Sequence, residues 1–337
     1  MLLPSRKLSV EIRELGEKGL LARIQRFCPP DTIGDDAAVL VMPPDRLLVV
    51  TTDLLVDGVH FSDRTTSPED VGWRAAAANL SDLAAMGAFP IGITVALGLP
   101  GNTKVDWVER LYQGMVECLQ HYQTTIVGGD ICRSSTISVA ITAFGQVLSE
   151  RIIRRRAAKL GDAIVATGVH GASRAGLELL LHPELGQSLT SAQRLSLIAA
   201  HQRPRPRLDV LPILWQIVGK SEAIAGMDSS DGLADAIVQL CQTSGVGAEI
   251  ERHQIPIPTD LNTLVSPEQA LEWALYGGED FELVLCLPLE MASLLVQQLS
   301  QATIVGRITA NSEVKLIDRT KEYPDQVLTL SQGFQHF

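Results

Sequence analysis

Four short stretches of the chain combine glycine with acidic residues in a pattern that suits metal chemistry. Glycine lets a backbone turn tightly or approach a ligand closely, and carboxylates are hard oxygen ligands that suit Mg²⁺. A single Gly-Asp pair is usually ordinary turn chemistry, but four stretches together with Asp53 and Asp82 favour a metal-binding site. The stretches are Gly34-Asp35-Asp36, Gly128-Gly129-Asp130, Asp228-Ser229-Ser230-Asp231-Gly232 and Gly277-Gly278-Glu279-Asp280.

The common signatures of nucleotide and hydrolase sites are missing from the sequence. There is no GxxxxGK[ST] phosphate loop, no HRD loop with a DFG partner and no GxSxG elbow. The glycine-rich GVHGASRAG at 168–176 lacks the residues of a phosphate loop, and we interpret it as mainly a structural turn before a helix. The formal net charge of −11 means that an anionic substrate would need metal ions as intermediaries.

The elements of the first half are expected to position several of these acidic side chains. Leu47–Thr52 is apolar and β-branched, which predicts a buried strand with Asp53 at its end. Ser67, followed by proline and two acidic residues, predicts the start of a helix that runs to about Met86 and carries Asp82. Further strands are predicted at 91–97, 126–127 and 137–147, with a helix over about 106–122.

A strongly basic segment, 151–159, marks the boundary between two predicted domains, residues 1–150 and 151–337. A chain of 337 residues exceeds the usual size of a single core, so two domains are the natural expectation. Because acidic motifs lie on both sides of the boundary, we expect both domains to contribute to the reaction centre. The second half should have strands near 163–167, 248–251 and 281–287 and helices near 192–201, 232–243 and 267–275.

Composition and charge narrow the class of protein. With 46% hydrophobic and 20% charged residues, the chain is typical of a folded globular protein. No apolar stretch approaches the ~20 residues of a membrane helix, and the N-terminal residues do not form a secretory signal, so we expect a cytoplasmic protein without a membrane partner. The acidic net charge disfavours nucleic acid as a partner. Five scattered cysteines predict neither disulfides nor a zinc site.

Seven motifs, in their order and spacing, resemble those of thiamine-monophosphate kinases across nearly the whole chain. The resemblance implies the two-domain α+β (mixed α/β) fold of aminoimidazole ribonucleotide synthetase relatives, in which the N-terminal sheets of two subunits pair into a barrel, and hence a homodimer. It also implies ATP-dependent phosphorylation of thiamine monophosphate with several Mg²⁺ ions. The motifs are IGDDAAV (33–39), TTDLLVDGVHF (51–61), NLSDLAAMGA (79–88), GGD (128–130), DSSDGL (228–233), GGEDFEL (277–283) and GFQHF (333–337).

The same resemblance implies roles for individual residues. The Mg²⁺ ligands would be Asp35, Thr51, Thr52, Asp53, Asp82, Asp130, Asp228 and Asp231. ATP would contact Tyr112, Gly129, Asp130, Ser230 and one arginine of the basic segment. Counting back from Gly161-Asp162 selects Arg155, which we favour, and counting forward from Asp130 selects Arg154. Thiamine monophosphate would meet His60, Glu279 and a C-terminal aromatic ring, for which Phe334 is our choice and Phe337 the alternative.

The expected reaction is a direct in-line transfer from ATP to the phosphate of thiamine monophosphate. Because a phosphate monoester has a second pKa of about 6, its oxygen is already ionised at neutral pH and needs no general base. An alternative is another ATP-dependent enzyme of the same superfamily, acting on a different substrate. A third is a noncatalytic calcium- or magnesium-binding protein, which the lack of an EF-hand pattern disfavours.

Overall fold

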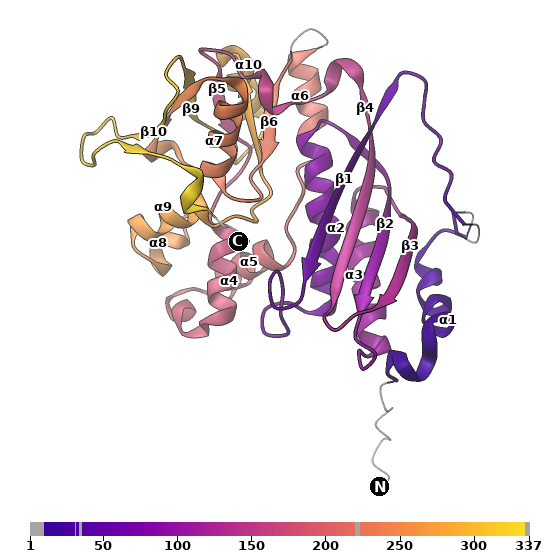
Figure 1. Cartoon of the computed structure of the whole chain (residues 1–337). Helices are drawn as coiled ribbons and strands as arrows, with labels where there is room; N and C mark the ends of the chain where they lie inside the picture. Colours follow the sequence, from indigo (N-terminus) through magenta and orange to yellow (C-terminus); the bar gives the residue numbers. More distant parts are fainter. Residues whose placement is uncertain (1–9, 31, 34–35, 220–222, 334–337) are drawn as a thin grey trace. The chain divides into compact units, whose positions relative to one another are not determined.

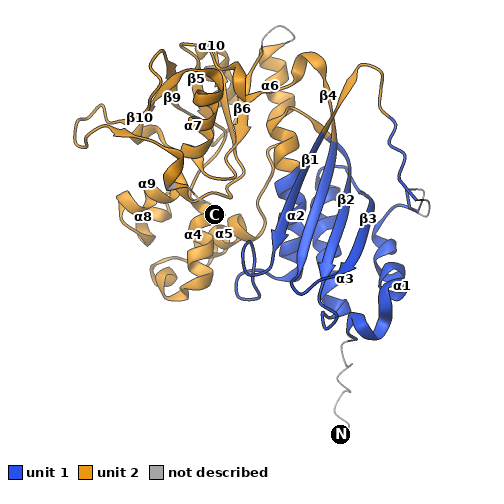
Figure 2. Ribbon diagram, in the orientation of Figure 1, with its two compact units in different colours: residues 1–41, 50–79, 90–144 blue, residues 42–49, 80–89, 145–337 orange. Residues whose placement is uncertain are grey.

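The computed structural model describes residues 10–30, 32–33, 36–219 and 223–333 of the 337-residue chain. The chain divides into two compact units, each built from several segments (Figure 2). Unit 1 comprises residues 1–41, 50–79 and 90–144, and unit 2 comprises residues 42–49, 80–89 and 145–337. The helix α2 (Pro68–Ala85) therefore contributes residues to both units.

The first half of the chain forms a four-stranded sheet in the order β1-β4-β2-β3. Figure 1 shows α2 and α3 on the same face of this sheet. Strands β2 and β3 run parallel, with an irregular register between Ile93 and Thr94. Besides α2, the elements are α1 (Ile12–Ile24), β1 (Arg46–Val56), β2 (Phe89–Leu99), α3 (Val105–His121), β3 (Ile126–Arg133) and β4 (Ser138–Leu148).

The helix α2 begins as its sequence predicts. The backbone N–H of Asp70 donates to the hydroxyl of Ser67 at 3.3 Å, and the Ser67 hydroxyl donates to the Asp70 carboxylate at 2.6 Å. The helix crosses α3 at close range, because a Cβ at Gly72 would lie 1.9 Å from the carbonyl oxygen of Leu111. These contacts fix the direction of α2, which carries Ser81 and Asp82 near its C-terminal end.

Strand β1 differs from the prediction of a buried strand. The side chains of Leu48, Val50 and Leu54 are 52%, 54% and 53% exposed, because β1 lies at the edge of the sheet and the helices cover only one face. The strand also continues past Asp53 to Val56, so Asp53 lies inside the strand and not at its end. Both parts of the prediction are wrong for the single chain, and an apolar sheet face is left exposed.

Unit 2 contains a seven-stranded mixed sheet in the order β11-β10-β7-β9-β5-β8-β6. Strand β10 runs parallel to β7, and the other described pairs are antiparallel. The strands are β5 (Ala163–Ala166), β6 (Ala225–Asp228), β7 (Gly247–Glu251), β8 (Leu283–Leu287), β9 (Thr303–Thr309), β10 (Val314–Ile317) and β11 (Gln326–Val327). The helices are α4 (Ala172–Leu181), α5 (Ser191–Gln202), α6 (Val210–Val218), α7 (Leu233–Ser244), α8 (Leu261–Leu264), α9 (Pro267–Tyr276) and α10 (Leu289–Gln298).

Two apolar clusters form the interior of unit 2. The larger cluster joins α7 to the sheet through residues such as Ile237, Ile164 and Val284. The smaller joins α4, α5, α8 and α9 through residues such as Leu179 and Trp273. Burial of apolar area at roughly 25 cal/mol per Å² makes these clusters the main stabilising term of the unit. The predicted helices near 192–201, 232–243 and 267–275 match α5, α7 and α9.

All five cysteines are free thiols in this structure. Three of them, Cys118, Cys241 and Cys286, are buried in the two halves of the chain. Burial raises the pKa of Cys241 to about 11, so this thiol is protonated at neutral pH. Among the described residues, no helix combines the length and the apolar character needed to cross a membrane.

Candidate functional site

Asp228 is the most enclosed of the described residues for which the sequence implies a metal-binding role. It closes β6 and is only 3% exposed. The hydroxyl of Ser81 donates to its Oδ2 at 2.7 Å, and the hydroxyl of Ser230 donates to its Oδ1 at 3.2 Å. Carboxylate oxygens are hard ligands, so the chemistry of this side chain suits a divalent cation. Because Ser81 precedes Asp82, this contact within unit 2 joins the NLSDLAAMGA and DSSDGL motifs.

The turn that follows β6 is bonded to the GGEDFEL loop by backbone groups. The N–H of Ser229 donates to the carbonyl of Glu282 at 2.8 Å, and the N–H of Glu279 donates to the carbonyl of Ser230 at 2.6 Å. The N–H of Gly232 closes the turn by donating to the carbonyl of Ser229 at 3.1 Å. Two motifs that lie about 50 residues apart in the sequence therefore form one connected structure.

The GGEDFEL loop has an unusual backbone. Gly278, Glu279 and Phe281 have φ angles of 67°, 59° and 52°. Positive φ is readily adopted by glycine but is uncommon for other residues, and for a bulky side chain such as phenylalanine it costs energy. Strain of this kind persists only where the surroundings hold the backbone in place, and it gathers at functional loops. The predicted strand near 281–287 consequently begins only at Leu283.

Asp280 is the side chain that anchors this strained loop. Its carboxylate accepts hydrogen bonds from the backbone N–H groups of Gly171 at 2.7 Å and Ser173 at 2.9 Å, at the N-terminus of α4. Burial raises the pKa of Asp280 to about 7; Glu282 and Glu279 add to this rise, and the two N–H donors oppose it. The GVHGASRAG segment therefore forms the turn before a helix that the sequence predicts, and the Asp280 carboxylate caps that helix.

Glu279, which the resemblance places against thiamine monophosphate, lies beside two polar residues of unit 2. Its side chain is 36% exposed, and its Oε2 lies 3.6 Å from Nδ1 of His201 on α5. The same ring nitrogen lies 3.2 Å from the hydroxyl of Ser173 on α4. A half-buried carboxylate that is held at its base by a strained loop points in a defined direction, which suits recognition of a cationic or hydrogen-bonding ligand.

A buried ion pair supports the other end of the GGEDFEL loop. Arg207 contacts the carboxylate of Glu282, which also accepts a hydrogen bond from the hydroxyl of Thr167 at 2.7 Å. Arg207 further donates to the carbonyl of Thr167 at 2.9 Å. Burial raises the pKa of Glu282, and the arginine opposes that rise. A buried carboxylate with two such partners is an anchor for the loop rather than a ligand group.

Four of the other residues predicted to bind Mg²⁺ lie on strands of unit 1. Thr51, Thr52 and Asp53 follow one another in the middle of β1, so their side chains alternate between the two faces. The hydroxyl of Thr52 donates to the carbonyl of Ile141 on β4 at 2.9 Å. Asp130 is exposed on β3. The backbone hydrogen bonds between the strands of the sheet therefore set the positions of these side chains.

Gly129 lies beside Asp130 on the same strand, opposite Val95 of β2. A Cβ at position 129 would lie 2.1 Å from the carbonyl oxygen of Val95. Only glycine fits this close approach, which is a structural reason for the residue in addition to any contact with ATP. The strand predicted at 126–127 extends through the GGD motif to Arg133, so this motif does not follow a strand but forms part of one.

His60 and Tyr112 are also in unit 1. The backbone N–H of Val56 donates to Nδ1 of His60 at 3.1 Å, so a neutral ring carries its proton on Nε2 and can donate to an acceptor there. Tyr112 on α3 is 3% exposed, and its ring lies 5.7 Å from that of Phe27. Burial raises the pKa of the Tyr112 phenol. The tyrosine contributes apolar surface at this position, and its ring is covered in this conformation.

The basic segment contains both candidate arginines. Arg155 begins a short 3-10 helix, η3 (Arg155–Ala157), and donates to Oε1 of Gln239 on α7 at 2.5 Å. The helix α7 directly follows the DSSDG turn, which contains Ser230. The hydrogen bond to Gln239 therefore connects Arg155 to the helix that begins just after this turn. Arg154 is exposed, and its backbone N–H donates to the carbonyl of Ile224.

The predicted site residues are only partly brought together. Asp82 is half-buried on α2, and Asp231 is exposed in the turn after β6. Within the ranges that the structure describes, no group of three or more histidine, cysteine, aspartate and glutamate side chains is close enough to hold a metal ion. Asp35 and Phe334 lie outside the described residues. Two anchoring roles, that of Ser81 toward Asp228 and that of Asp280 toward α4, could not be predicted from the sequence, because the partners lie 147 and more than 100 residues away.

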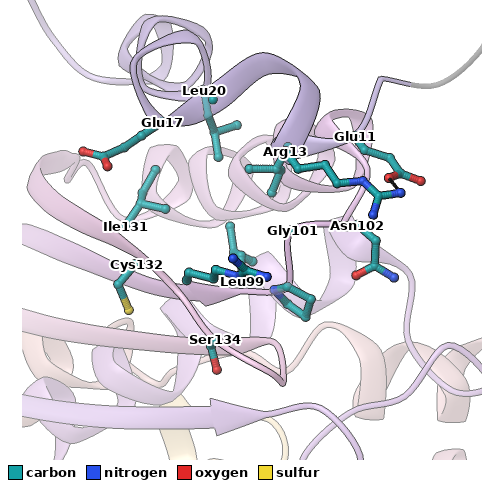
Figure 3. Close-up of a pocket in the computed structure, with 14 residues that line it drawn as sticks. Glu11, Arg13, Glu17, Leu20, Leu99, Gly101, Asn102, Ile131, Cys132 and Ser134 are labelled. Atoms are coloured by element: carbon teal, nitrogen blue, oxygen red, sulfur yellow. Dashed lines mark ion pairs between the residues drawn. The ribbon is translucent and has the colours of Figure 1, made fainter.

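A cavity of the described structure lies elsewhere in unit 1 (Figure 3). It has a volume of about 760 Å³ and is lined by parts of α1 and by the C-terminal ends of β2 and β3, including Glu17, Asn102 and Cys132. Figure 3 shows side chains of both charges around it, with Arg13 paired to Glu11. None of the residues predicted to bind metal, ATP or substrate lines this cavity.

Comparison with known proteins gives consistent matches over most of the chain. The model of the AIR synthase related protein, N-terminal domain, matches residues 34–147, and that of the C-terminal domain matches residues 159–319. A thiamine-monophosphate kinase from Synechococcus elongatus is 50% identical over 332 residues, which cover 97% of this chain and 98% of the relative. These matches, with the two mixed α/β halves, confirm the predicted mixed α/β fold of AIR synthase related proteins, whereas the pairing of two N-terminal sheets stays a prediction.

Two solved structures are similar over nearly the same extent. The crystal structure of thiamine-monophosphate kinase from Stenotrophomonas maltophilia K279a has a TM-score of 0.75 and 34% identity, covering 88% of this chain and 94% of that one. The structure of AaThiL complexed with AMPPCP and TMP has a TM-score of 0.72 and 34% identity, covering 96% of this chain and 99% of that one.

Proposed function

Because the chain belongs to the thiamine-monophosphate kinase family of AIR synthase related proteins, we propose that it transfers the γ-phosphoryl group of ATP to thiamine monophosphate. The products are thiamine diphosphate and ADP, so the enzyme acts in the synthesis of thiamine diphosphate. The observation that carries this proposal is the near full-length likeness to kinases of this name, one of which was solved with AMPPCP and TMP.

The geometry of the DSSDG turn supports a phosphoryl-transfer site. Asp228 is held by two hydroxyl donors, and its carboxylate is a hard oxygen ligand of the kind that Mg²⁺ prefers. We assign Mg²⁺ binding to Asp228 and Asp231 of this turn, to Asp82 on α2, to Asp130 on β3, to Thr51, Thr52 and Asp53 on β1, and to Asp35. Bound Mg²⁺ would neutralise phosphate charge and orient the phosphates.

The protein's own side chains bind and orient the two substrates. ATP is assigned to Ser230, to Gly129 and Asp130, to Tyr112 and to Arg155. Thiamine monophosphate is assigned to Nε2 of His60 as a donor, to the exposed edge of Glu279 and to Phe334. No side chain needs to remove a proton, because the attacking phosphate oxygen is ionised above a pKa of about 6.

We also propose that the protein is a cytoplasmic homodimer whose first domain, residues 1–150, binds metal and ATP and mediates dimerisation. The exposed apolar side chains of Leu48, Val50 and Leu54 on the edge strand β1 support this proposal. An edge strand with an apolar face is a surface that another copy can cover. The second domain, residues 151–337, completes the nucleotide and substrate site.

Product analysis tests the proposed activity directly. Purified protein is incubated with ATP, Mg²⁺ and thiamine monophosphate, and the products are separated and quantified. We expect thiamine diphosphate and ADP in equal amounts, with no product when Mg²⁺ is chelated. Unphosphorylated thiamine should be a poor acceptor, because no base is placed to activate a hydroxyl. Efficient conversion of thiamine to thiamine monophosphate, or ADP without thiamine diphosphate, would contradict the proposal.

A further inference from the structure

His170 is a fully buried histidine in the GVHGAS segment between β5 and α4, and the proposed reaction assigns it no role. Its Nδ1 lies 3.2 Å from the carbonyl oxygen of Gly168, and its Nε2 lies 3.0 Å from the hydroxyl of Ser229. Its backbone N–H donates to the carbonyl of Pro256 at 2.8 Å. The ring is thus held at both nitrogens and at its base.

The partners of His170 determine its tautomer. Burial lowers the pKa of His170 to about 4, so the ring is neutral at physiological pH and carries one N–H. The carbonyl of Gly168 can only accept a hydrogen bond, so the proton resides on Nδ1. Nε2 therefore has a lone pair, and the hydroxyl of Ser229 donates to it. The carbonyl of Glu282, 3.2 Å from the same hydroxyl, is the more distant of two acceptors.

Ser229 lies directly between Asp228 and Ser230 in the DSSDG turn, and its side chain is fully buried. Its backbone N–H is bonded to Glu282, while its hydroxyl is bonded to the His170 ring. The first bond restrains the peptide between Asp228 and Ser229, and the second restrains the Ser229 side chain. Together they hold the stretch of backbone from which Asp228 and Asp231 project, although neither bond reaches those carboxylates.

We propose that His170 is a positioning residue for the DSSDG turn, and that its bond to Ser229 orients Asp228 and Asp231 for binding Mg²⁺ and ATP. The inference rests on the proposed function, since it assumes that this turn binds the metal. Groups that orient metal ligands from outside the coordination shell typically change metal affinity by about 10–100-fold. Loss of the His170–Ser229 bond should therefore weaken metal-dependent nucleotide binding without unfolding the protein.

Two substitutions at position 170 separate the functions of the two ring nitrogens. His170→Asn places an amide near the position of Nδ1 and leaves the Ser229 hydroxyl with only its more distant acceptor, the carbonyl of Glu282. His170→Gln places an amide near the position of Nε2 and can accept from Ser229. Ser229→Ala removes the hydroxyl at a buried site with the smallest change in shape, so it remains informative if a variant at position 170 fails to fold. His182→Asn, at an exposed histidine of the same unit, is the matched control.

The experiment measures equilibrium binding of AMPPCP by calorimetry over a range of Mg²⁺ concentrations, so it does not depend on turnover. His170→Asn and Ser229→Ala should each raise the Mg²⁺ concentration needed for half-maximal binding by about tenfold. His170→Gln and His182→Asn should stay within about twofold of the wild type. The double variant Ser229→Ala/His170→Asn should bind no more weakly than either single variant, because both remove the same bond.

A second measurement reports on the bond itself. In ¹⁵N spectra of the histidine rings, the wild type should show one buried ring with an unprotonated Nε2, and its shift should change in Ser229→Ala. Unchanged Mg²⁺ dependence in both His170→Asn and Ser229→Ala, or equal weakening in His170→Gln and His170→Asn, would overturn the inference. If the wild type bound AMPPCP equally well with and without Mg²⁺, the proposed function would fail and this inference with it.

Discussion

The two halves of the chain hold their acidic motifs in different ways. In unit 2, Asp228 is buried and Asp280 and Glu282 are partly buried, and each accepts hydrogen bonds from hydroxyl, backbone or guanidinium groups. In unit 1, Asp53 and Asp130 stand on strands, where the ladder of the sheet sets their position. A loop needs side-chain anchors to hold a ligand group, whereas a strand does not. The two halves should therefore respond differently to substitution.

The largest expected effect tests whether both kinds of carboxylate serve the same chemistry. We expect Asp130→Ala and Asp228→Ala each to lower turnover by about a hundredfold or more, since a metal ion contributes several kcal/mol to transition-state stabilisation. Steady-state rates at saturating Mg²⁺ and ATP measure the loss. A variant that kept near-normal turnover would remove that residue from the metal site.

The stability of the same two variants should differ, because only Asp228 is an anchor for other groups. Asp228→Ala leaves the hydroxyls of Ser81 and Ser230 without their acceptor, which should lower the free energy of unfolding by about 1–3 kcal/mol. Asp130→Ala, on an exposed strand, should change it by less than about 0.5 kcal/mol. Urea unfolding compares the two, and equal losses would break the distinction between strand and loop.

The second prediction concerns the exposed face of β1. If a second copy covers this face, Val50→Asp places a carboxylate in an apolar interface, and the dimer dissociation constant should rise by at least about tenfold. Sedimentation equilibrium measures the change. Leu294→Asp, at a leucine of α10 with similar exposure, is the matched control and should leave the association unchanged. A wild-type protein that is monomeric at micromolar concentration would contradict the dimer proposal itself.

The exposed face of β1 also shows what the sequence could not reveal. Helices α2, α5, α7 and α9 were predicted closely, because their caps and apolar periodicity are local signals. The apolar sequence of β1 does not distinguish a strand whose second face is covered by its own chain from one whose second face is covered by another chain. The helix α6 was missed, since its nine residues carry little polar pattern and contain a proline.

In the candidate site, too, local features could be predicted from the sequence and long-range contacts could not. Carboxylates in glycine-rich motifs could be recognised in the sequence, because their chemistry is local to each motif. The groups that hold them could not, since Ser81 and His170 act on residues 147 and 59 positions away. Asp280 shows the limit most clearly. It belongs to an acidic motif, yet its carboxylate caps α4 and holds the strained loop instead of facing a ligand.

A third prediction uses the pH dependence of Asp280. Its pKa in the folded protein is raised from 3.8 to about 7, so the folded state binds a proton more tightly than the unfolded state. The resulting stability is fully present below about pH 3.8 and is lost as the pH rises through about 7, by up to about 1.4 kcal/mol per pH unit. Asp280→Asn should abolish this loss, so the variant gains stability relative to the wild type between pH 4 and pH 7. Urea unfolding at several pH values measures the slope, and parallel curves would refute the assignment.

The smaller of the two pH effects is expected at His170, and its sign is opposite to that of Asp280. The pKa of this histidine is lowered from 6.5 to about 4, so the unfolded state binds the proton more tightly. Its contribution is fully present above about pH 6.5 and is lost as the pH falls through about 4, again by up to about 1.4 kcal/mol per pH unit. Between pH 4 and pH 6.5 the two anchors therefore oppose each other in the wild type. His170→Gln removes only the histidine contribution, so this variant should become more stable relative to the wild type as the solution is acidified. A variant whose unfolding free energy followed the wild-type curve over this range would show that His170 is protonated in the folded protein and cannot accept from Ser229.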